Sequence, residues 1–177
     1  MNLMTRVLSR GIACAVLAAG CLIASAPPAL SQAGTLAPVA DGHGVFVAQN
    51  QETHVFAFSL LELPNGTIHG QAVVLEPATQ GLVVVDITSF MFIGDILAMA
   101  GPITTAINAP PQFVEGATAF FSVKDNGSGS PIPDEFTGVG VVPPQFGNLT
   151  IQQIIALIGP PPPEAFSPLL LGNVRIY

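Results

Sequence analysis

Two alternating segments joined by one short turn constrain the fold of this chain more than any other feature. Residues 53–61 and residues 67–76 each alternate apolar and polar side chains. A period of two is typical of strands with one buried face. The intervening Leu63-Pro64-Asn65-Gly66 fits a type I turn followed by a bulge glycine. We therefore predict a hairpin that brings the two apolar faces together by pairing residue 60 with 70, 58 with 72 and 56 with 74.

The rest of the chain carries further strand signals. Leu82–Phe92 is a long apolar run, Gly94-Asp95 is a two-residue turn signal, and residues 96–103 return as a partner strand. Short connections make neighbouring strands antiparallel. The remaining strand candidates are residues 44–49, 117–124, 136–142 and 173–177.

One short amphipathic helix is predicted near the C-terminus. Thr150 and Gln153 form the pattern of a capping box. Ile151, Ile154, Ile155 and Ile158 follow the helical spacing, and Gly159 with the following prolines ends it. We predict an all-β domain over residues 34–177: an antiparallel β-sandwich or small barrel of about eight strands with this helix packed against it.

The first 33 residues have the order of a secretory signal peptide. Arg6 and Arg10 precede an apolar run at residues 11–26, and small residues lead to a cleavage site after Ala33. The run is shorter than the roughly 20 residues that a membrane-spanning helix needs. We expect a secreted, periplasmic or envelope protein with no membrane span after cleavage. Lipid anchoring through Cys21, at the end of a lipobox-like segment, is the alternative.

Composition narrows the classes of partner and chemistry. Both cysteines, Cys14 and Cys21, lie in the predicted signal peptide, so residues 34–177 offer no disulfide, thiolate metal site or cysteine nucleophile. The same residues hold two basic and eleven acidic side chains, a formal net charge of −9. Nucleic acids and anionic membrane surfaces need basic patches, so neither is expected as a partner. A membrane-spanning barrel is disfavoured because tryptophan is absent and Tyr177 is the only tyrosine.

Several strand and turn motifs carry a resemblance to known proteins. They are F-x-F at 56–58, PNGTIHGQ at 64–71, DIT at 86–88, FFSVKDNG at 120–127, DEF at 134–136 and GNVRI at 172–176. Together they resemble small secreted bacterial all-β domain proteins of largely uncharacterised function. The resemblance implies an exported all-β architecture and no particular reaction.

The candidate ligand-binding residues are three phenylalanines and one aspartate. Phe56, Phe58 and Phe121 lie at positions that could line the inside of an eight-stranded barrel, which is just wide enough for one small ligand. Asp86 interrupts a run of β-branched residues. It faces either solvent or a buried site with a perturbed pKa, and we favour the solvent face because no basic partner is evident.

The candidate metal site is the polar loop at residues 125–135. Its Asp125, Asn126, Asp134 and Glu135 offer the oxygen donors that calcium prefers. The spacing does not match an EF-hand, and Asp-Asn-Gly is also common in turns, so a solvated hairpin loop is the simpler interpretation. Calcium is the one cofactor considered. In the predicted register His54 lies opposite Glu76 and His69 opposite Leu61, so these two histidines do not converge. His43 could approach either of them.

Proline-rich connectors form another recurring feature. Pro110–Phe113 and Pro143–Phe146 repeat the tetrapeptide PPQF, and we predict loops that are held down by their phenylalanines.

No set of catalytic residues stands out, so the favoured function is non-enzymatic. We expect a secreted or envelope-associated β module that binds an unknown protein or small molecule, or has a structural role. The first alternative is a barrel that carries a small molecule. The second is a barrel-type isomerase or cyclase, which would need Asp86 or a histidine inside a closed pocket.

Overall fold

The computed structural model describes residues 37–48 and 51–177. All of them belong to one compact unit, residues 34–177. The predicted signal peptide, its cleavage site and Cys21 lie outside the described residues.

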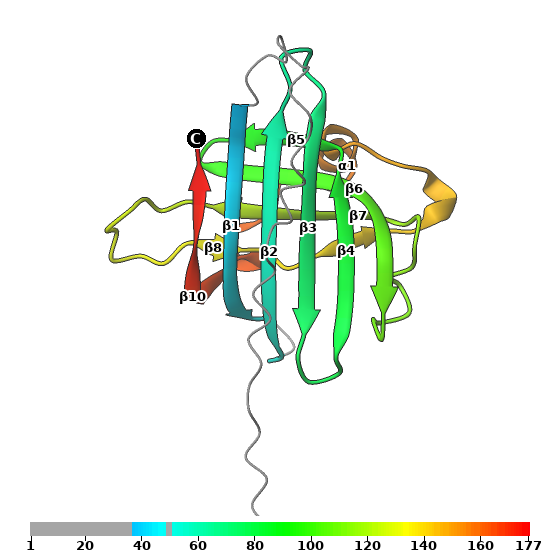
Figure 1. Ribbon diagram of the computed structural model, residues 1–177, viewed down its shortest axis with the longest axis horizontal. Coiled ribbons are helices and arrows are strands. Elements are labelled where there is room, and N and C mark those ends of the chain that lie inside the picture. Colours follow the sequence, from blue (N-terminus) through cyan, green and yellow to red (C-terminus); the bar gives the residue numbers. More distant parts are fainter. Residues whose placement is uncertain (1–36, 49–50) are drawn as a thin grey trace, which may run out of the picture. The chain divides into compact units, whose positions relative to one another are not determined.

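Antiparallel strands close into a barrel, which confirms the predicted fold class (Figure 1). Pairing runs in the order β6-β4-β3-β2-β1-β10-β8-β7, and β7 pairs back with β6, so eight strands complete the circuit. The two remaining segments lie outside this circuit, β5 beside β6 and β9 beside β7. The strand bounds are β1 (Ala37–Val47), β2 (Thr53–Glu62), β3 (Ile68–Glu76), β4 (Gly81–Ile87), β5 (Ser89–Ile93), β6 (Ile96–Ile107), β7 (Thr118–Lys124), β8 (Glu135–Phe136), β9 (Gly140–Val142) and β10 (Ser167–Ile176).

The barrel has two layers whose strands run across one another. Figure 1 shows β10, β1, β2, β3 and β4 side by side in front of β5, β6 and β7. Strand β6 belongs to both layers: its first half pairs with β5 and β7, and its end pairs with β4. A register shift opposite Val84 and Val85 marks the bend. Gly101 allows it, because a Cβ there would collide with the carbonyl oxygen of Asp86.

The central hairpin has the predicted register. Strand β2 pairs with β3 through Leu60 and Gly70, Phe58 and Ala72, and Phe56 and Val74. The N–H of Gly66 donates to the carbonyl oxygen of Leu63 at 2.8 Å, and Gly66 has a φ of 79°, as a type I turn with a bulge glycine requires. Local turn chemistry and side-chain alternation therefore determine this part of the fold.

The two terminal strands are longer than predicted. Strand β1 begins at Ala37 rather than at residue 44, and β10 begins at Ser167 rather than at residue 173. Proline and glycine interrupt both segments: Pro38, Gly42 and Gly44 in β1, and Pro168 and Gly172 in β10. These residues weaken the alternating pattern that predicts a strand. The strands form because they pair with each other along most of their length.

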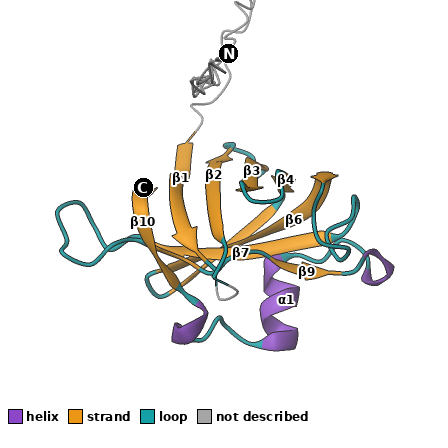
Figure 2. Ribbon diagram, turned by 90° about the horizontal axis from the view of Figure 1, so that it is seen from below, coloured by secondary structure: helices purple, strands orange, loops and turns teal. Residues whose placement is uncertain are grey.

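The helix α1 (Ile151–Ile158) has the predicted capping box and packs outside the barrel (Figure 2). The side chain of Thr150 accepts from the Gln153 N–H, and the Gln153 side chain accepts from the Thr150 N–H. Ile151 and Ile154 pack on the small outer side chains Ala98 and Ala100 of β6. Two short 3-10 helices, η1 (Pro144–Phe146) and η2 (Pro163–Ala165), flank it in the sequence.

Close packing between β1 and β2 fills the interior. Gly42 lies opposite Phe58 and Gly44 lies opposite Phe56. A Cβ at Gly44 would lie 2.8 Å from the carbonyl oxygen of Leu171 and 3.0 Å from Cε1 of Phe56. The glycines therefore provide the space into which the two rings fit.

We expect Gly44→Ala to destabilise the protein by about 1–3 kcal/mol, because the added methyl group overpacks the interior and meets fixed backbone. This cost should exceed the benefit of about 0.4–1 kcal/mol that removing a glycine confers through the unfolded state. Guanidinium unfolding measures the difference. His43→Ala, on the exposed face of the same strand, is the control and should stay within about 0.5 kcal/mol. An unchanged or raised stability of Gly44→Ala would contradict this packing.

Candidate functional site

The three phenylalanines predicted to line a ligand cavity belong to a packed aromatic cluster. Phe56, Phe58 and Phe121 have exposed fractions of 2%, 6% and 1%. The Phe56 ring stacks on Phe136 with 4.4 Å between centroids, and Phe58 meets Phe121 edge to face at 6.2 Å. These rings fill the barrel as a core. None of the three lines the open pocket described below.

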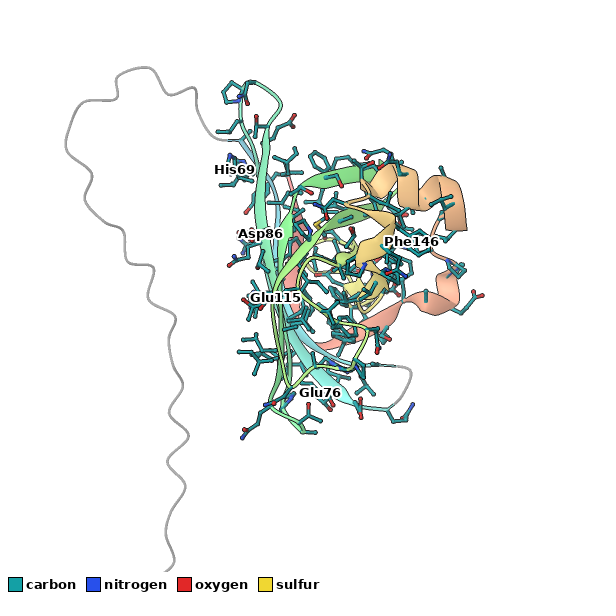
Figure 3. All side chains as sticks on the ribbon, turned by 90° about the vertical axis from the view of Figure 1, so that its right-hand side faces the viewer. His69, Glu76, Asp86, Glu115 and Phe146 are labelled. Carbon is teal, nitrogen blue, oxygen red and sulfur yellow. The ribbon has the colours of Figure 1, made fainter. Side chains whose placement is uncertain are left out.

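Asp86 lies on the outer face of β4, as its favoured interpretation predicts. The inward side chains of this strand are Val83, Val85 and Ile87, and Asp86 has the opposite parity. Its Oδ1 accepts a hydrogen bond from Gln71 Nε2 at 3.3 Å. Figure 3 shows Asp86 and His69 on the outer side of this layer. The isomerase or cyclase alternative therefore cannot use Asp86 inside the barrel.

The acidic loop fastens the open edge of β10. Both carboxylate oxygens of Asp134 accept backbone N–H groups, from Asn126 at 2.9 Å and from Val174 at 2.7 Å. Asp125 repeats the arrangement with Gly127 at 2.7 Å and Ile176 at 3.1 Å. Direct pairing of β10 with β8 covers only two residue pairs. The two aspartates thus continue the closure of the barrel where strand pairing ends.

These hydrogen bonds give Asp125 and Asp134 a role in the fold. Within residues 37–48 and 51–177, no group of three or more His, Cys, Asp or Glu residues could hold a metal ion. Asn126 donates from Nδ2 to the carbonyl oxygen of Pro133 at 2.6 Å. Glu135 lies in β8, opposite Lys124 in the strand register of β7 and β8. Calcium binding by Asp125, Asn126, Asp134 and Glu135 remains a prediction.

An open pocket of about 380 Å³ lies at one mouth of the barrel. It is bounded by the end of β1, the start of β2, the end of β3 and the start of β4. The loop after β6 and the connection between β8 and β9 complete its wall. The lining residues are mostly apolar: Phe46, Ala48, Val74, Gly81, Val83, Ala109, Pro110, Phe113, Gly138 and Val139, with Glu52, His54, Glu76, Gln112 and Thr137 as the polar members.

Strand register brings His54 and Glu76 to this mouth. Phe46 pairs with His54 across β1 and β2, and Glu76 pairs with Gly81 across β3 and β4. The β2–β3 pairing ends one residue earlier, at Val55 and Leu75. A row of inward-facing residues therefore crosses the four adjacent strands β1 to β4: Phe46, His54, Glu76 and Gly81. The His54 ring stacks on Phe46 at 5.4 Å between centroids, which holds the imidazole against the pocket wall.

Glu76 is the most unusual member of the row. Its exposed fraction is 9%. Within the described part of the chain, no hydrogen bond or ion pair to its carboxylate is found. No fully buried side-chain oxygen or nitrogen there lacks a partner, so the Glu76 oxygens open into the pocket. A largely buried acidic residue without a protein partner carries a desolvation cost.

Sequence reasoning did not select Glu76 or the pocket walls around it. Glu76 shares the inward parity of Ala72 and Val74, so a charged residue on a predicted apolar face was the available signal. The loop after β6 also forms part of the pocket wall. The sequence indicated this more weakly, through the first PPQF motif at Pro110–Phe113. Its Phe113 packs against the core and lines the pocket, as predicted. Phe146 of the second PPQF motif is 62% exposed, so the prediction that it holds its loop down is wrong.

A second, smaller pocket of about 290 Å³ lies beside α1. It lies between Ile151, Ile155 and Ile158 of the helix, the prolines 160–162 and the region of β9. Its lining residues include no ionisable side chain. The mouth pocket is therefore the better candidate, because it combines apolar walls with a few polar groups.

Comparisons with known proteins do not assign the chain to a family. No family model, no curated protein and no solved structure matches the chain. No helix among the described residues is both long enough and apolar enough to cross a bilayer. The resemblance to small secreted bacterial all-β proteins stays a prediction.

We expect Asp134→Asn to destabilise the protein by about 1–3 kcal/mol, because one buried backbone N–H loses its acceptor. Thermal or denaturant unfolding measures the change. Asp86→Asn is the matched control on the outer face, and its effect should stay within about 0.5 kcal/mol. Equal effects of the two variants would show that Asp134 does not fasten β10.

Proposed function

We propose that this protein is an exported, non-enzymatic β module that binds a small, largely apolar molecule in the mouth pocket. One observation carries the proposal: an open pocket with mostly apolar walls is lined by Glu76, a residue with an exposed fraction of 9% whose carboxylate has no protein partner among the described residues. Small-molecule sites typically combine predominantly apolar walls with a few placed polar groups.

The size and position of the pocket support binding. Its volume of about 380 Å³ lies at the lower end of the range of about 300–1,000 Å³ that is usual for ligand sites. The packed phenylalanine cluster leaves the mouth, rather than the centre of the barrel, as the place for a ligand. Four of its walls are strand ends, which hold their side chains in fixed positions.

The enzyme alternative has one observation in its favour. His54 and Glu76 come from neighbouring strands into the same pocket, and a histidine with a carboxylate can perform acid–base chemistry. Thr137 is the one hydroxyl residue among the lining residues, and its hydroxyl already accepts from the Ser122 N–H and donates to the Gly138 carbonyl oxygen, so no activated hydroxyl nucleophile is evident there and binding remains the favoured function. Turnover of a bound molecule that is lost in His54→Ala would favour the enzyme alternative.

We expect N-phenyl-1-naphthylamine, a neutral probe that fluoresces in apolar sites, to bind the protein saturably. Ala109→Trp should weaken this binding at least about ten-fold, because the indole occupies space inside the pocket. Gln112→Trp fills the rim of the pocket and serves as a second variant, and circular dichroism verifies that both variants fold.

Ala57→Trp is the control, since Ala57 is exposed on the outer face of β2. Its affinity for the probe should equal that of the parent protein. Absence of saturable binding to the parent protein, or equal affinity in all variants, would overturn the proposed function. Weaker binding in Ala57→Trp alone would place the probe on the outer face and would also overturn it.

A further inference from the structure

We propose that the mouth pocket selects organic cations: an amine whose positive charge pairs with Glu76 and whose apolar body occupies the pocket. This inference rests on the proposed function and specifies the chemical class of the ligand. The structural basis is the carboxylate of Glu76, an aromatic ring in the pocket wall and the absence of Lys and Arg from the lining residues.

The carboxylate of Glu76 has no protein partner among the described residues. The free energy of a mostly buried carboxylate falls when a cation or hydrogen-bond donor compensates its charge. The pocket residues that could donate from side chains are His54, Gln112 and Thr137. None of these is hydrogen-bonded to Glu76 within the described ranges. The oxygens of Glu76 are thus available to a donor that enters from solvent.

Lys124 and Arg175, which are the Lys and Arg residues of positions 34–177, both lie away from Glu76. Lys124 Nζ lies 3.0 Å from Asp95 Oδ2 at the β5–β6 turn. Their hydrogen bond lowers the pKa of Asp95 and raises the pKa of Lys124. Arg175 is exposed on the outer face of β10. Neither side chain lines the mouth pocket, so no Lys or Arg pairs with Glu76, and His54 is the one basic residue among the lining residues.

A cation bound in the pocket would lie beside aromatic side chains. Phe113 places an aromatic ring in the pocket wall, next to the stacked rings of Phe46 and His54. Cations are attracted to the faces of aromatic rings, and the attraction grows when water is excluded. A second carboxylate, Glu52, also lines the pocket. The formal net charge of −9 for residues 34–177 adds a field that attracts cations and repels anions.

Three probes of similar size and shape separate charge from apolar contact: benzylamine is a cation at pH 7, benzyl alcohol is neutral and benzoate is an anion. Isothermal titration calorimetry of residues 34–177 at low salt gives the three affinities. We expect benzylamine to bind at least about ten-fold more tightly than benzyl alcohol, and benzoate more weakly than either.

Two variants with the same change in charge identify the responsible carboxylate. Glu76→Gln should reduce the affinity for benzylamine about ten-fold and leave the affinity for benzyl alcohol unchanged. Asp86→Asn removes a carboxylate from the outer face and should change neither affinity. The selectivity should fall as salt is added, although less steeply than for an exposed ion pair.

The outcomes separate this inference from the proposed function. If benzyl alcohol binds as tightly as benzylamine, the cation preference is wrong and the binding function stands. If Asp86→Asn weakens benzylamine as much as Glu76→Gln does, the preference reflects net charge and the assignment to Glu76 is overturned. If neither N-phenyl-1-naphthylamine nor any of the three probes binds, the proposed function fails as well.

Discussion

Phe136 lies where the two layers of the barrel meet, and the rest of the interior is arranged around its ring. The ring centroid lies 4.4 Å from that of Phe56, 4.8 Å from that of Phe46 and 5.5 Å from that of Phe121. These partners come from β2, β1 and β7, so one side chain joins the front and back layers. Such a cluster needs small residues beside it, because close packing leaves no spare volume in a narrow barrel.

This filling of the interior determines where the protein can hold a ligand. An eight-stranded barrel either fills with side chains or retains one small cavity. Here the phenylalanines occupy the centre, and the open space lies at one mouth, where Phe46, Val74 and Val83 line it. There the inward positions change from apolar residues to His54 and Glu76. The core residues and the residues of the candidate site therefore occupy successive inward-facing positions along the same strands.

Closure of the barrel depends on polar contacts as well as on strand pairing. The β8 segment is short, and only its two residues pair with the start of β10. Beyond them, backbone N–H groups of β10 face the acidic loop, and Asp125 and Asp134 accept their hydrogen bonds. A buried backbone donor needs an acceptor whether or not a strand lies beside it. The acids of the predicted metal site thus have a role in the fold.

The sequence by itself determined the local elements, because each depends on residues close together in the chain. The β2–β3 register follows from alternation and from the turn at residues 63–66, and helix α1 follows from Thr150, Gln153 and the isoleucine spacing. The outward position of Asp86 was expected from the lack of a basic partner, and the burial pattern of β4 agrees with it. Tertiary structure alone decided that the strands close into a barrel, that Gly42 lies within a strand, and that His54, Glu76 and Phe113 share one pocket. These features depend on contacts between residues far apart in the sequence, whose pairing is set by the packing of the whole interior rather than by any local pattern.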